Sequence, residues 1–359
     1  MLAFGEFPQV EKACLQEAAR ASAVHLHTTH SHHDAQNWLE QHQPAALLLA
    51  EGGNDPTGLA QGTRAQARYR QLPILALAKE PSDLIFADAY SWGADDVVAP
   101  DSAWGLTVRL RALVHDRNTP PTLPRRGMAV VAESARNRRV AVARALFNAG
   151  YSVCFALTEN DAREFALREE VTLVVFSTEI CPNADEFIRE TQAHGCLAHF
   201  IASDAPRKAK QTRLACQHLP HCRISDTSCP PEDIVFMANE LSAKPTENKR
   251  LSPRILFGTT IRYRPEGMEE DELGFSYNVS QGGLFVRTLA PPQENLIWLE
   301  VKPPTSPLRV RLLGEVVWRR AYGPNGHATV PPGFAIKIID GARRDLERWQ
   351  EGCARAESI

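Results

Sequence analysis

The chain has 359 residues, of which 43% are apolar and 23% are charged, and its formal net charge at pH 7 is −3. This composition is ordinary for a folded globular protein and excludes a largely disordered chain. No apolar run approaches the ~20 residues that cross a bilayer, and the first residues lack the regions of a secretory signal. We therefore expect a cytoplasmic protein without membrane insertion.

The charge is unevenly distributed along the chain. Residues 1–248 hold 24 basic and 30 acidic side chains, a net of −6, whereas residues 249–350 hold 15 and 11, a net of +4. A mildly basic C-terminal segment suits a small anionic ligand, but it is too weakly basic to predict nucleic-acid binding.

The eight cysteines are scattered and form no CxxC pair, which is typical of reduced thiols. A zinc site made of Cys216, Cys222 and Cys229 would have unusual ligand spacings, so we expect no metal there.

Two polar stretches rich in proline, at 117–127 and 242–253, have the composition of linkers. They predict three domains, each long enough to bury a core of its own. The predicted domain boundaries are 1–117, 127–243 and 248–359.

The first segment alternates apolar strands with helical stretches. Short apolar runs at 44–50, 72–78 and 95–100 predict strands, and 105–116 predicts a helix because its leucines at 106, 110 and 113 recur at helical spacing. Continuous apolar strands with interleaved helices predict a parallel sheet that is covered on both faces.

The second segment repeats this plan. The apolar run VTLVVFS at 171–177 corresponds to PAALLLA at 44–50. The other predicted strands lie at 127–134, 151–158, 197–203 and 221–226, and the predicted helices at 136–150, 160–170 and 230–241.

Both segments resemble the receiver domains of two-component signalling, which have a flavodoxin-like parallel sheet of five strands. The resemblance implies an aspartate that accepts a phosphoryl group at the end of the third strand, and a lysine ahead of a proline that stabilises it. This sequence has Ala50 and Ser177 at the two acceptor positions and Ala99 at the lysine position of the first copy. The acids near the first strands are isolated: Glu6, Glu51 and Glu133.

Without the acceptor carboxylate, no aspartyl phosphate can form. We therefore expect two degenerate receiver-like domains that serve in interaction or dimerisation, with a homo-oligomer left open. Phosphoryl transfer to Asp95 or Asp96 is disfavoured, because these residues lie near the fifth predicted strand and not the third.

The histidine-rich stretch HLHTTHSHHD at 25–34 suggests a metal site. His25 and His27 would share one face of a strand, and three further histidines follow at the next turn: His30, His32 and His33. We favour a solvated polar strand end. The effect of zinc or nickel on the melting temperature distinguishes the two readings.

From residue 250 onward the apolar pattern has a period of two. Runs at 254–264, 283–289, 295–303, 308–321 and 333–340 predict short strands without intervening helices. Leu308, Val310 and Leu312 are predicted to face one way and Arg309 and Arg311 the other; Phe334, Ile336 and Ile338 alternate with an outward Lys337. This pattern predicts an antiparallel barrel or sandwich.

The chain ends in a predicted helix with one apolar stripe, which we expect to cap an open end of the barrel. The stripe consists of Leu346, Trp349, Cys353 and Ala356.

Between the predicted strands, YNVSQGGLFV at 277–286 has the composition of a turn. Asn278 and Ser280 can form local side-chain hydrogen bonds, while Gly282 and Gly283 tolerate positive φ and carry no Cβ. Such a turn exposes polar atoms beside bare backbone.

Upstream, Arg250 and Arg254 flank a Leu-Ser-Pro stretch in which Pro253 disfavours a continuous helix. The pattern RxxxR at 250–254, followed by NxSxxG at 278–283, resembles the paired signature of the PilZ domain, the bacterial cyclic di-GMP receptor module. The segments GLFVRT and GEVVW are similar to that family too, and the resemblance covers about residues 248–350.

The resemblance implies a cyclic di-GMP site. Arg250 and Arg254 would bind the O6 and N7 edge of guanine, stack on the base and pair with phosphate. Asn278 and Ser280 would bind the other guanine edge, and Gly283 would permit close approach of the ligand. We interpret Lys249 as a solvated lysine.

The leading hypothesis is a non-enzymatic cyclic di-GMP effector without a cofactor, which acts in bacterial signal transduction through a protein partner. Ligand binding would order the 242–254 linker and reorient the barrel against the receiver-like domains. The alternative is a ligand-independent scaffold that only binds proteins. No motif places a nucleophile beside a base; His221 and Cys222 are merely adjacent in sequence.

Overall fold

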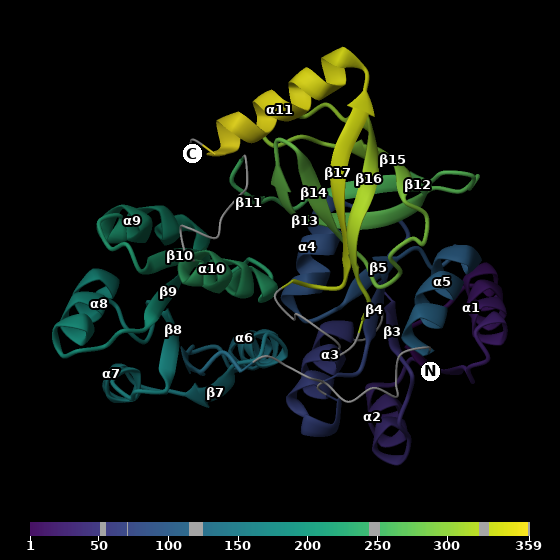
Figure 1. The fold of residues 1–359 in the computed structure, drawn as a ribbon. Coiled ribbons are helices and arrows are strands. Elements are labelled where there is room, and N and C mark those ends of the chain that lie inside the picture. The colour runs from purple at the N-terminus through teal and green to yellow at the C-terminus, as the bar shows by residue number, and fades with distance from the viewer. Residues whose placement is uncertain (51–54, 70, 115–124, 244–251, 323–329, 358–359) are drawn as a thin grey trace. The chain divides into compact units, whose positions relative to one another are not determined.

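The computed structural model describes residues 1–50, 55–69, 71–114, 125–243, 252–322 and 330–357 (Figure 1). It contains two five-stranded parallel sheets and one antiparallel barrel with a C-terminal helix. This confirms the predicted fold class. The chain forms two compact units: one holds the first sheet together with the barrel, and the other holds the second sheet.

The first α/β domain has the strand order β2-β1-β3-β4-β5, with all neighbours parallel. This is the flavodoxin-like order. Its strands are β1 (Leu2–Phe4), β2 (His27–Thr29), β3 (Leu47–Ala50), β4 (Ile74–Leu77) and β5 (Asp96–Val98). Its helices are α1 (Gln9–Ala21), α2 (His32–Gln41), α3 (Pro56–Ala65), the 3-10 turn η1 (Ala67–Tyr69), α4 (Asp83–Ser91) and α5 (Ala103–Val114).

The apolar pattern explains how these elements pack. The strands are buried on both faces, and each face of the sheet contributes to a separate apolar cluster. Leu106, Leu110 and Leu113 of α5 are buried against one of them, as their helical spacing predicts. The sequence pattern thus places α5 on the sheet and fixes which of its faces remains outside.

The second α/β domain repeats the topology with the order β10-β9-β8-β6-β7. Strand β8 (Val171–Ser177) coincides with the predicted run. The other strands are β6 (Met128–Ala132), β7 (Ser152–Phe155), β9 (His199–Asp204) and β10 (Cys222–Asp226). The helices are α6 (Arg136–Asn148), α7 (Glu159–Ala166), α8 (Ala184–Ala193), α9 (Pro206–Cys216) and α10 (Glu232–Ser242).

The barrel closes through six antiparallel strands in the order β13-β12-β15-β16-β17-β14, since β14 pairs again with β13. A short seventh strand, β11, pairs with the end of β13. The strands are β11 (Ile255–Leu256), β12 (Thr260–Pro265), β13 (Glu272–Ser280), β14 (Gly283–Arg287), β15 (Leu296–Val301), β16 (Val310–Arg320) and β17 (Gly333–Gly341).

The C-terminal helix α11 (Arg343–Glu357) packs on the barrel as its apolar stripe predicts (Figure 1). Trp349 and Cys353 are completely buried in the barrel core. A Cβ at Gly352 would lie 2.5 Å from the carbonyl oxygen of Pro304, so only glycine permits this close approach. Within the described ranges, no helix is both long and apolar enough to cross a membrane.

The predicted orientation of one residue, Leu308, is wrong. Leu308 was expected to face inward with Val310 and Leu312, but β16 begins only at Val310, and Leu308 is 54% exposed. The residues before Val310 belong to the loop, in which Ser306 accepts a hydrogen bond from the Leu308 amide. The period-two pattern of apolar residues was extended beyond the end of the strand, and it therefore assigned an inward face to Leu308, which is a loop residue.

Arg109 on α5 joins the first α/β domain to the barrel. Its guanidinium donates to Asp96 of β5 at 2.9 Å, to Glu272 of β13 at 3.1 Å and to the carbonyl oxygen of Leu273 at 2.8 Å. The Arg109 side chain is 1% exposed, and that of Asp96 is fully buried. Burial opposes the charged form, but the two carboxylates outweigh it and raise the pKa of Arg109 above its ordinary value.

Asp96 also contacts the barrel directly. Its carboxylate also accepts hydrogen bonds from the Thr288 hydroxyl at 3.1 Å and the Leu289 amide at 2.9 Å, both from the segment after β14. Buried charges are tolerated where partners satisfy them in this way.

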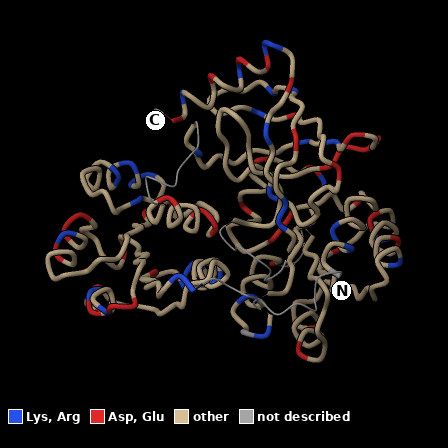
Figure 2. The backbone as a smooth tube through the Cα atoms, in the orientation of Figure 1, with Lys and Arg blue, Asp and Glu red and all other residues tan. Residues whose placement is uncertain are grey.

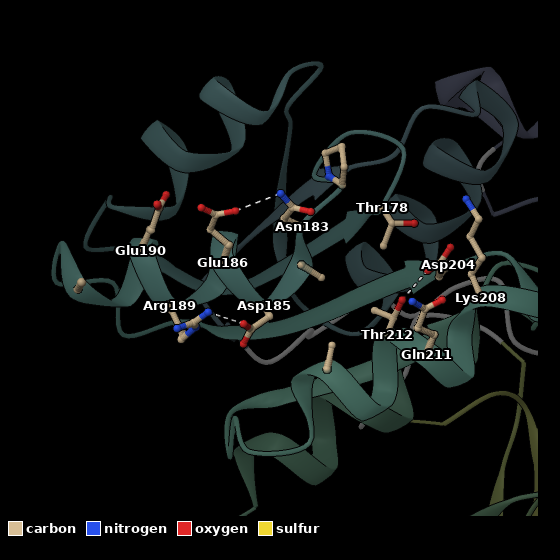
Figure 3. A pocket seen from close by; sticks show the side chains of 14 residues that line it. Thr178, Asn183, Asp185, Glu186, Arg189, Glu190, Asp204, Lys208, Gln211 and Thr212 are labelled. Atoms are coloured by element: carbon tan, nitrogen blue, oxygen red, sulfur yellow. Dashed lines mark hydrogen bonds and ion pairs between the residues drawn. The ribbon is translucent and has the colours of Figure 1, made fainter.

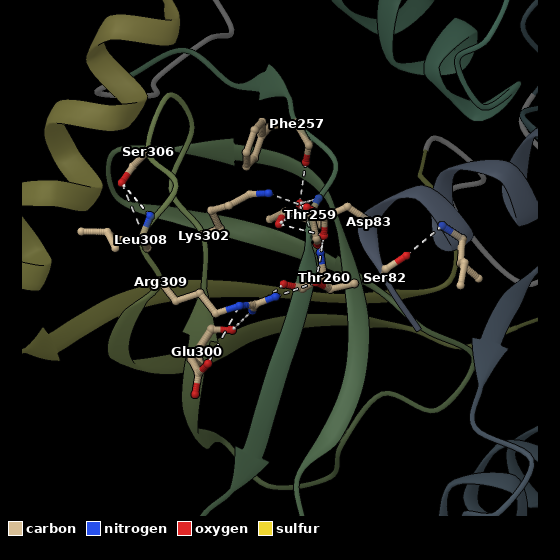
Figure 4. Close-up of polar contacts among 12 residues, drawn as sticks. Ser82, Asp83, Phe257, Thr259, Thr260, Glu300, Lys302, Ser306, Leu308 and Arg309 are labelled. Carbon is tan, nitrogen blue, oxygen red and sulfur yellow. Dashed lines mark hydrogen bonds and ion pairs between the residues drawn. The ribbon is translucent and has the colours of Figure 1, made fainter. Parts of the chain in front are cut away.

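A second polar contact lies at the start of α4 (Figure 4). The Asp83 carboxylate accepts from the Thr260 amide at 2.7 Å and from the Thr259 hydroxyl at 3.2 Å, and it pairs with Lys302 at 2.6 Å. Arg309 supports this arrangement, because it donates to the Thr260 hydroxyl at 2.7 Å. Charge-assisted bonds of this kind are short and directional.

Aromatic packing fills the space between these polar contacts. The ring of Phe275 on β13 stacks on Phe86 at 5.1 Å and meets Tyr90 edge-on at 5.7 Å, both on α4. The guanidinium of Arg287 lies 3.4 Å from the centre of the Tyr90 ring. Such pairs add to the energy of area burial, so the barrel is held firmly on the α4 to α5 face.

Replacing Arg109 by Ala should lower the free energy of unfolding by about 3–5 kcal/mol, because Asp96 is then left buried without its cation. Chemical denaturation measures this loss. Arg111→Ala on the exposed face of α5 is the control and should cost less than about 1 kcal/mol. The double variant Arg109→Met/Asp96→Asn should be more stable than Arg109→Ala, since position 96 then carries no unpaired buried charge. A single Arg109→Ala variant as stable as the control would contradict this account.

Asp83 should make stability depend on pH. Burial acts to raise the pKa of Asp83, but hydrogen bonds from Lys302 and Thr260 outweigh it, so the folded pKa lies below the ordinary value. The resulting stabilisation is present above the unfolded pKa of about 3.9 and is lost as the pH falls through the folded pKa. Wild type should thus exceed Asp83→Asn in stability above about pH 5, and the gap should narrow toward about pH 3.

Unfolding curves recorded across this range test the prediction. The control variant is Asp101→Asn, at an exposed aspartate outside these contacts. A gap between wild type and Asp83→Asn that stays constant from about pH 6 to pH 3 would show that Asp83 contributes no such dependence.

Candidate functional site

The predicted turn at 277–286 is in fact a tight strand connection. Strand β13 continues through Ser280, and only Gln281 and Gly282 separate it from β14. Asn278 was expected in the turn, but it lies inside β13 and is only 3% exposed. This corrects the expectation that the turn would present the Asn278 side chain to solvent.

A β-bulge precedes this connection. The pairing of β13 with β14 shifts between Ser276 and Asn278, which leaves Tyr277 as the extra residue. Tyr277 and Phe285 are buried with their rings 6.2 Å apart, and Phe285 lies 5.9 Å from the half-exposed ring of Trp318. The last residues of β13 are thereby placed next to an aromatic group on the outer face of the barrel.

Glycine is required at position 283 for a reason that the sequence did not reveal. Gly282 and Gly283 can tolerate positive φ, but neither adopts it. A Cβ at position 283 would instead lie 2.1 Å from the carbonyl oxygen of Ile336 on β17. The bare backbone at Gly283 therefore allows the barrel to close.

Neighbouring elements hold the connection in place. The Ile338 amide donates to the Gly282 carbonyl oxygen at 3.0 Å. The Trp349 indole on α11 donates to the Ser280 carbonyl oxygen at 3.1 Å. The Ser280 hydroxyl donates to the carbonyl oxygen of Gly283 at 3.2 Å, which confirms the local side-chain bond predicted for this serine. Contacts from both β17 and α11 thus preorganise the loop.

Strand register brings Arg254 to this loop. Ile255 of β11 pairs with Val279 of β13, and both face the barrel core. Arg254 directly precedes β11, and Ser280 directly follows Val279 on β13, so the register places the two residues close together in the fold. Arg254 is exposed. Arg250, its predicted partner, lies outside the described residues.

The register also reveals a cation that the motif did not include. Ser280 pairs with Gly283, and Gly283 pairs with Lys337 of β17. Ser280, Gly283 and Lys337 therefore form one row across three strands on the outer face, Arg254 lies just before β11 near the Ser280 end of this row, and Lys337 is exposed. We call these four residues the outer row.

Lys337 was predicted to point outward, and this is confirmed, since Phe334 and Ile336 are buried in the core. Its proximity to Gly283 depends on pairing between strands about fifty residues apart in sequence. Sequence alternation gives the face of a residue but not its neighbour across the barrel.

The receiver-like sheets lack an acceptor carboxylate at the described third strands. Strand β3 ends in Ala50 and β8 ends in Ser177, as predicted. Glu6 is exposed, Glu51 lies outside the described residues, and burial raises the pKa of Glu133, whose carboxylate lies 3.5 Å from Arg138.

Asp95 and Asp96 are committed to structural contacts. Asp95 pairs with Arg64 at 2.6 Å and accepts from the Ile74 amide at 2.8 Å, while Asp96 pairs with Arg109. Both aspartates are nearly completely buried, and they lie at the amino end of β5. They are therefore inaccessible to a phosphodonor.

The second α/β domain has a polar pocket of about 960 Å³ between α8 and α9 (Figure 3). Several of its polar groups contact one another: Asp185 pairs with Arg189 at 2.5 Å and with His218 at 3.0 Å, and Asp204 accepts from Thr212 at 2.6 Å.

The histidine cluster is dispersed in the structure. His27 stacks on Trp38 at 5.1 Å, His32 meets Phe4 edge-on, and His33 contacts Asn37. Cys216 and Cys222 are buried in the core of the second α/β domain. Across the described part of the chain, no three histidine, cysteine or acidic side chains are grouped so that they could hold a metal ion.

Comparisons with known proteins give only remote likenesses. No family model and no curated protein matches the chain. The chain is similar to the structure of the Bacillus subtilis inhibitor of motility at 17% identity and a TM-score of 0.26; the match covers 31% of this chain and about half of that protein, 52%.

Two further solved structures are single domains. The PilZ domain of CeSA from a cellulose-synthesizing bacterium is 16% identical, with a TM-score of 0.23 and coverage of 30% of this chain and 99% of that one. The receiver domain of a histidine kinase from Syntrophus aciditrophicus is 13% identical, with a TM-score of 0.30 and coverage of 34% and 96%.

At these scores the likenesses carry no argument, and the strand orders of the chain itself decide the fold. Two receiver-like domains precede a PilZ-like barrel. Both parallel sheets have the flavodoxin-like order, and the barrel carries the described part of the paired motif at one loop.

Incubation with a small phosphodonor such as acetyl phosphate should leave the mass of the protein unchanged. The reason is the lack of a carboxylate at the ends of β3 and β8 and the burial of Asp95 and Asp96. Intact-mass spectrometry measures the outcome. Phosphorylation localised to any aspartate of either receiver-like domain would overturn this prediction.

Proposed function

We propose that this protein is a non-enzymatic cyclic di-GMP-binding effector in signal transduction, with the nucleotide bound at the outer row of the PilZ-like barrel. The observation that carries this proposal is the register of β13, β14 and β17, which aligns Ser280, Gly283 and Lys337, together with the β11 pairing that brings Arg254 near the end of β13. A polar row with two cations around a bare backbone position suits a flat ligand that carries two phosphates.

Each residue has a chemical role in the proposed complex. Arg250 and Arg254 bind the O6 and N7 acceptors of guanine, stack on the base and pair with phosphate. Ser280, whose hydroxyl proton is donated to the Gly283 carbonyl oxygen, accepts a hydrogen bond from the other guanine edge, and Gly283 leaves room for close approach. Lys337, on the far side of Gly283, adds a point charge for the second phosphate.

A contact between the nucleotide and Asn278 requires part of the chain to move. Its side chain is buried, so a guanine edge reaches its amide only if neighbouring residues shift. A ligand shifts such an equilibrium only through contacts that one state alone provides.

The proposed conformational change concerns the second receiver-like domain. The barrel is held on the first domain by the buried contacts of Arg109, Asp96 and Asp83, within one compact unit. The linker at 242–254 connects this unit to the second domain. Nucleotide binding would order the linker through its two arginines and reorient the barrel, together with the first domain, against the second.

Calorimetric titration with cyclic di-GMP tests the site. Wild type should bind, and Arg250→Ala or Arg254→Ala should weaken affinity by at least about tenfold, because each removes a charge-assisted contact of about 1.5–3 kcal/mol. Lys337→Ala should weaken it about fivefold or less, and this effect should fade at high salt. Lys79→Ala, at an exposed lysine of the first domain, is the matched control and should change nothing.

The same titration separates the alternatives. No heat and no shift in melting temperature with cyclic di-GMP would reject the proposal and leave a scaffold that only binds proteins. Small-angle scattering with and without saturating nucleotide tests the reorientation, which predicts a change in the radius of gyration. Tight binding with an unchanged scattering profile would retain the site but reject the movement.

A further inference from the structure

A groove of about 710 Å³ lies between α5 and the barrel, within the unit that contains both. Helix α5 contributes Trp104, Val108, Arg111 and Ala112. The three apolar residues recur every four positions and form one stripe on the side of α5 that faces away from its buried leucines. The stripe is about 12 Å long, since the rise is about 1.5 Å per residue.

The opposite wall is apolar as well. It consists of Pro265 and Met268 at the β12 to β13 turn and of Ala290, Pro291 and Pro292 in the segment after β14. Trp104 and Met268 are each 42% exposed. Large apolar side chains that line a solvent-open groove from two walls are typical of an interaction site.

The rim of the groove is strongly acidic. Five of the seven residues at 266–272, EGMEEDE, are acids, and this turn is mostly red in Figure 2. Glu269, Glu270 and Glu294 line the groove, and in the described part of the chain neither Glu269 nor Glu270 is paired with a cation. Glu272, by contrast, is already neutralised by Arg109.

We propose that this groove docks a basic amphipathic helix of a partner protein. Apolar residues on one face of the incoming helix would pack between Trp104 and Met268, and flanking lysines or arginines would pair with Glu269, Glu270 and Glu294. Helix-in-groove recognition uses such anchors at helical spacing. Nucleic acids and anionic membranes are disfavoured because the acidic rim repels phosphate.

The docking surface is composite. One wall belongs to the first receiver-like domain and the other to the barrel, and the Arg109 to Glu272 ion pair spans them beside the groove. Neither domain alone presents both walls. The proposal is independent of cyclic di-GMP binding, because the outer row and the groove share no residue.

The test uses the full chain and a synthetic amphipathic peptide of about 18 residues, built from Leu and Lys at helical spacing and labelled with a fluorophore. Fluorescence anisotropy should show binding of this peptide and none of a twin in which Glu replaces every Lys. The double variant Glu269→Lys/Glu270→Lys should weaken binding at least tenfold. Trp104→Ala should weaken it several-fold through lost apolar contact.

A matched control separates the groove from the overall charge of the protein. Glu347→Lys/Glu351→Lys on α11 makes the same change in net charge on an exposed helix face and should leave affinity within about twofold. Equal weakening by the control, or full affinity in Trp104→Ala, would overturn the proposal.

Hydrogen exchange of wild type gives a second readout that does not depend on the variants. The bound peptide should protect amides of α5 and of the 265–272 segment together. Protection that is confined to another part of the molecule would reject the groove as the docking site.

Discussion

The buried guanidinium of Arg109 is the constraint on which the rest of the structure depends. It is removed from water, so its charge must be compensated, and the two carboxylates that do so come from different domains: Asp96 from the receiver-like sheet and Glu272 from the barrel. Separating the domains would leave charges to be solvated again or left unpaired. Together with the contacts of Asp83 and Phe275, this side chain holds two domains of distant sequence in one compact unit.

Much of this architecture could be predicted from the sequence. Periodicity was sufficient where elements are long or strongly apolar, as for β8, α5 and the stripe of α11. It missed β1, because three apolar residues at the start of the chain do not form a recognisable pattern, and it missed most of β13, whose glycine and polar residues resemble a turn. The contacts of Arg109 with Glu272 and Leu273 could not be predicted from the sequence, since they join residues more than 160 positions apart.

At the candidate site, too, the sequence did not reveal contacts between residues that are far apart in the chain. Ser280 and Gly283 of the motif do pair with each other, but Asn278 lies buried inside β13 and not in the turn. The glycine requirement comes from the approach of β17, and the inclusion of Lys337 in the outer row comes from the same pairing. Both are consequences of barrel closure, which no local pattern encodes.

Strand β13 connects the two surfaces that we assign to ligands. Glu272 at its first residue lines the groove, and Ser280 at its last residue lies in the outer row, about 27 Å away along the strand. Because neighbours are hydrogen-bonded to β13 near both of its ends, it is poorly suited to transmit a movement. A rigid barrel on a fixed first domain instead favours separate roles for the two surfaces. The groove would hold a partner at a constant position. The nucleotide would act at the linker, where Arg250 and Arg254 connect the barrel to the second receiver-like domain.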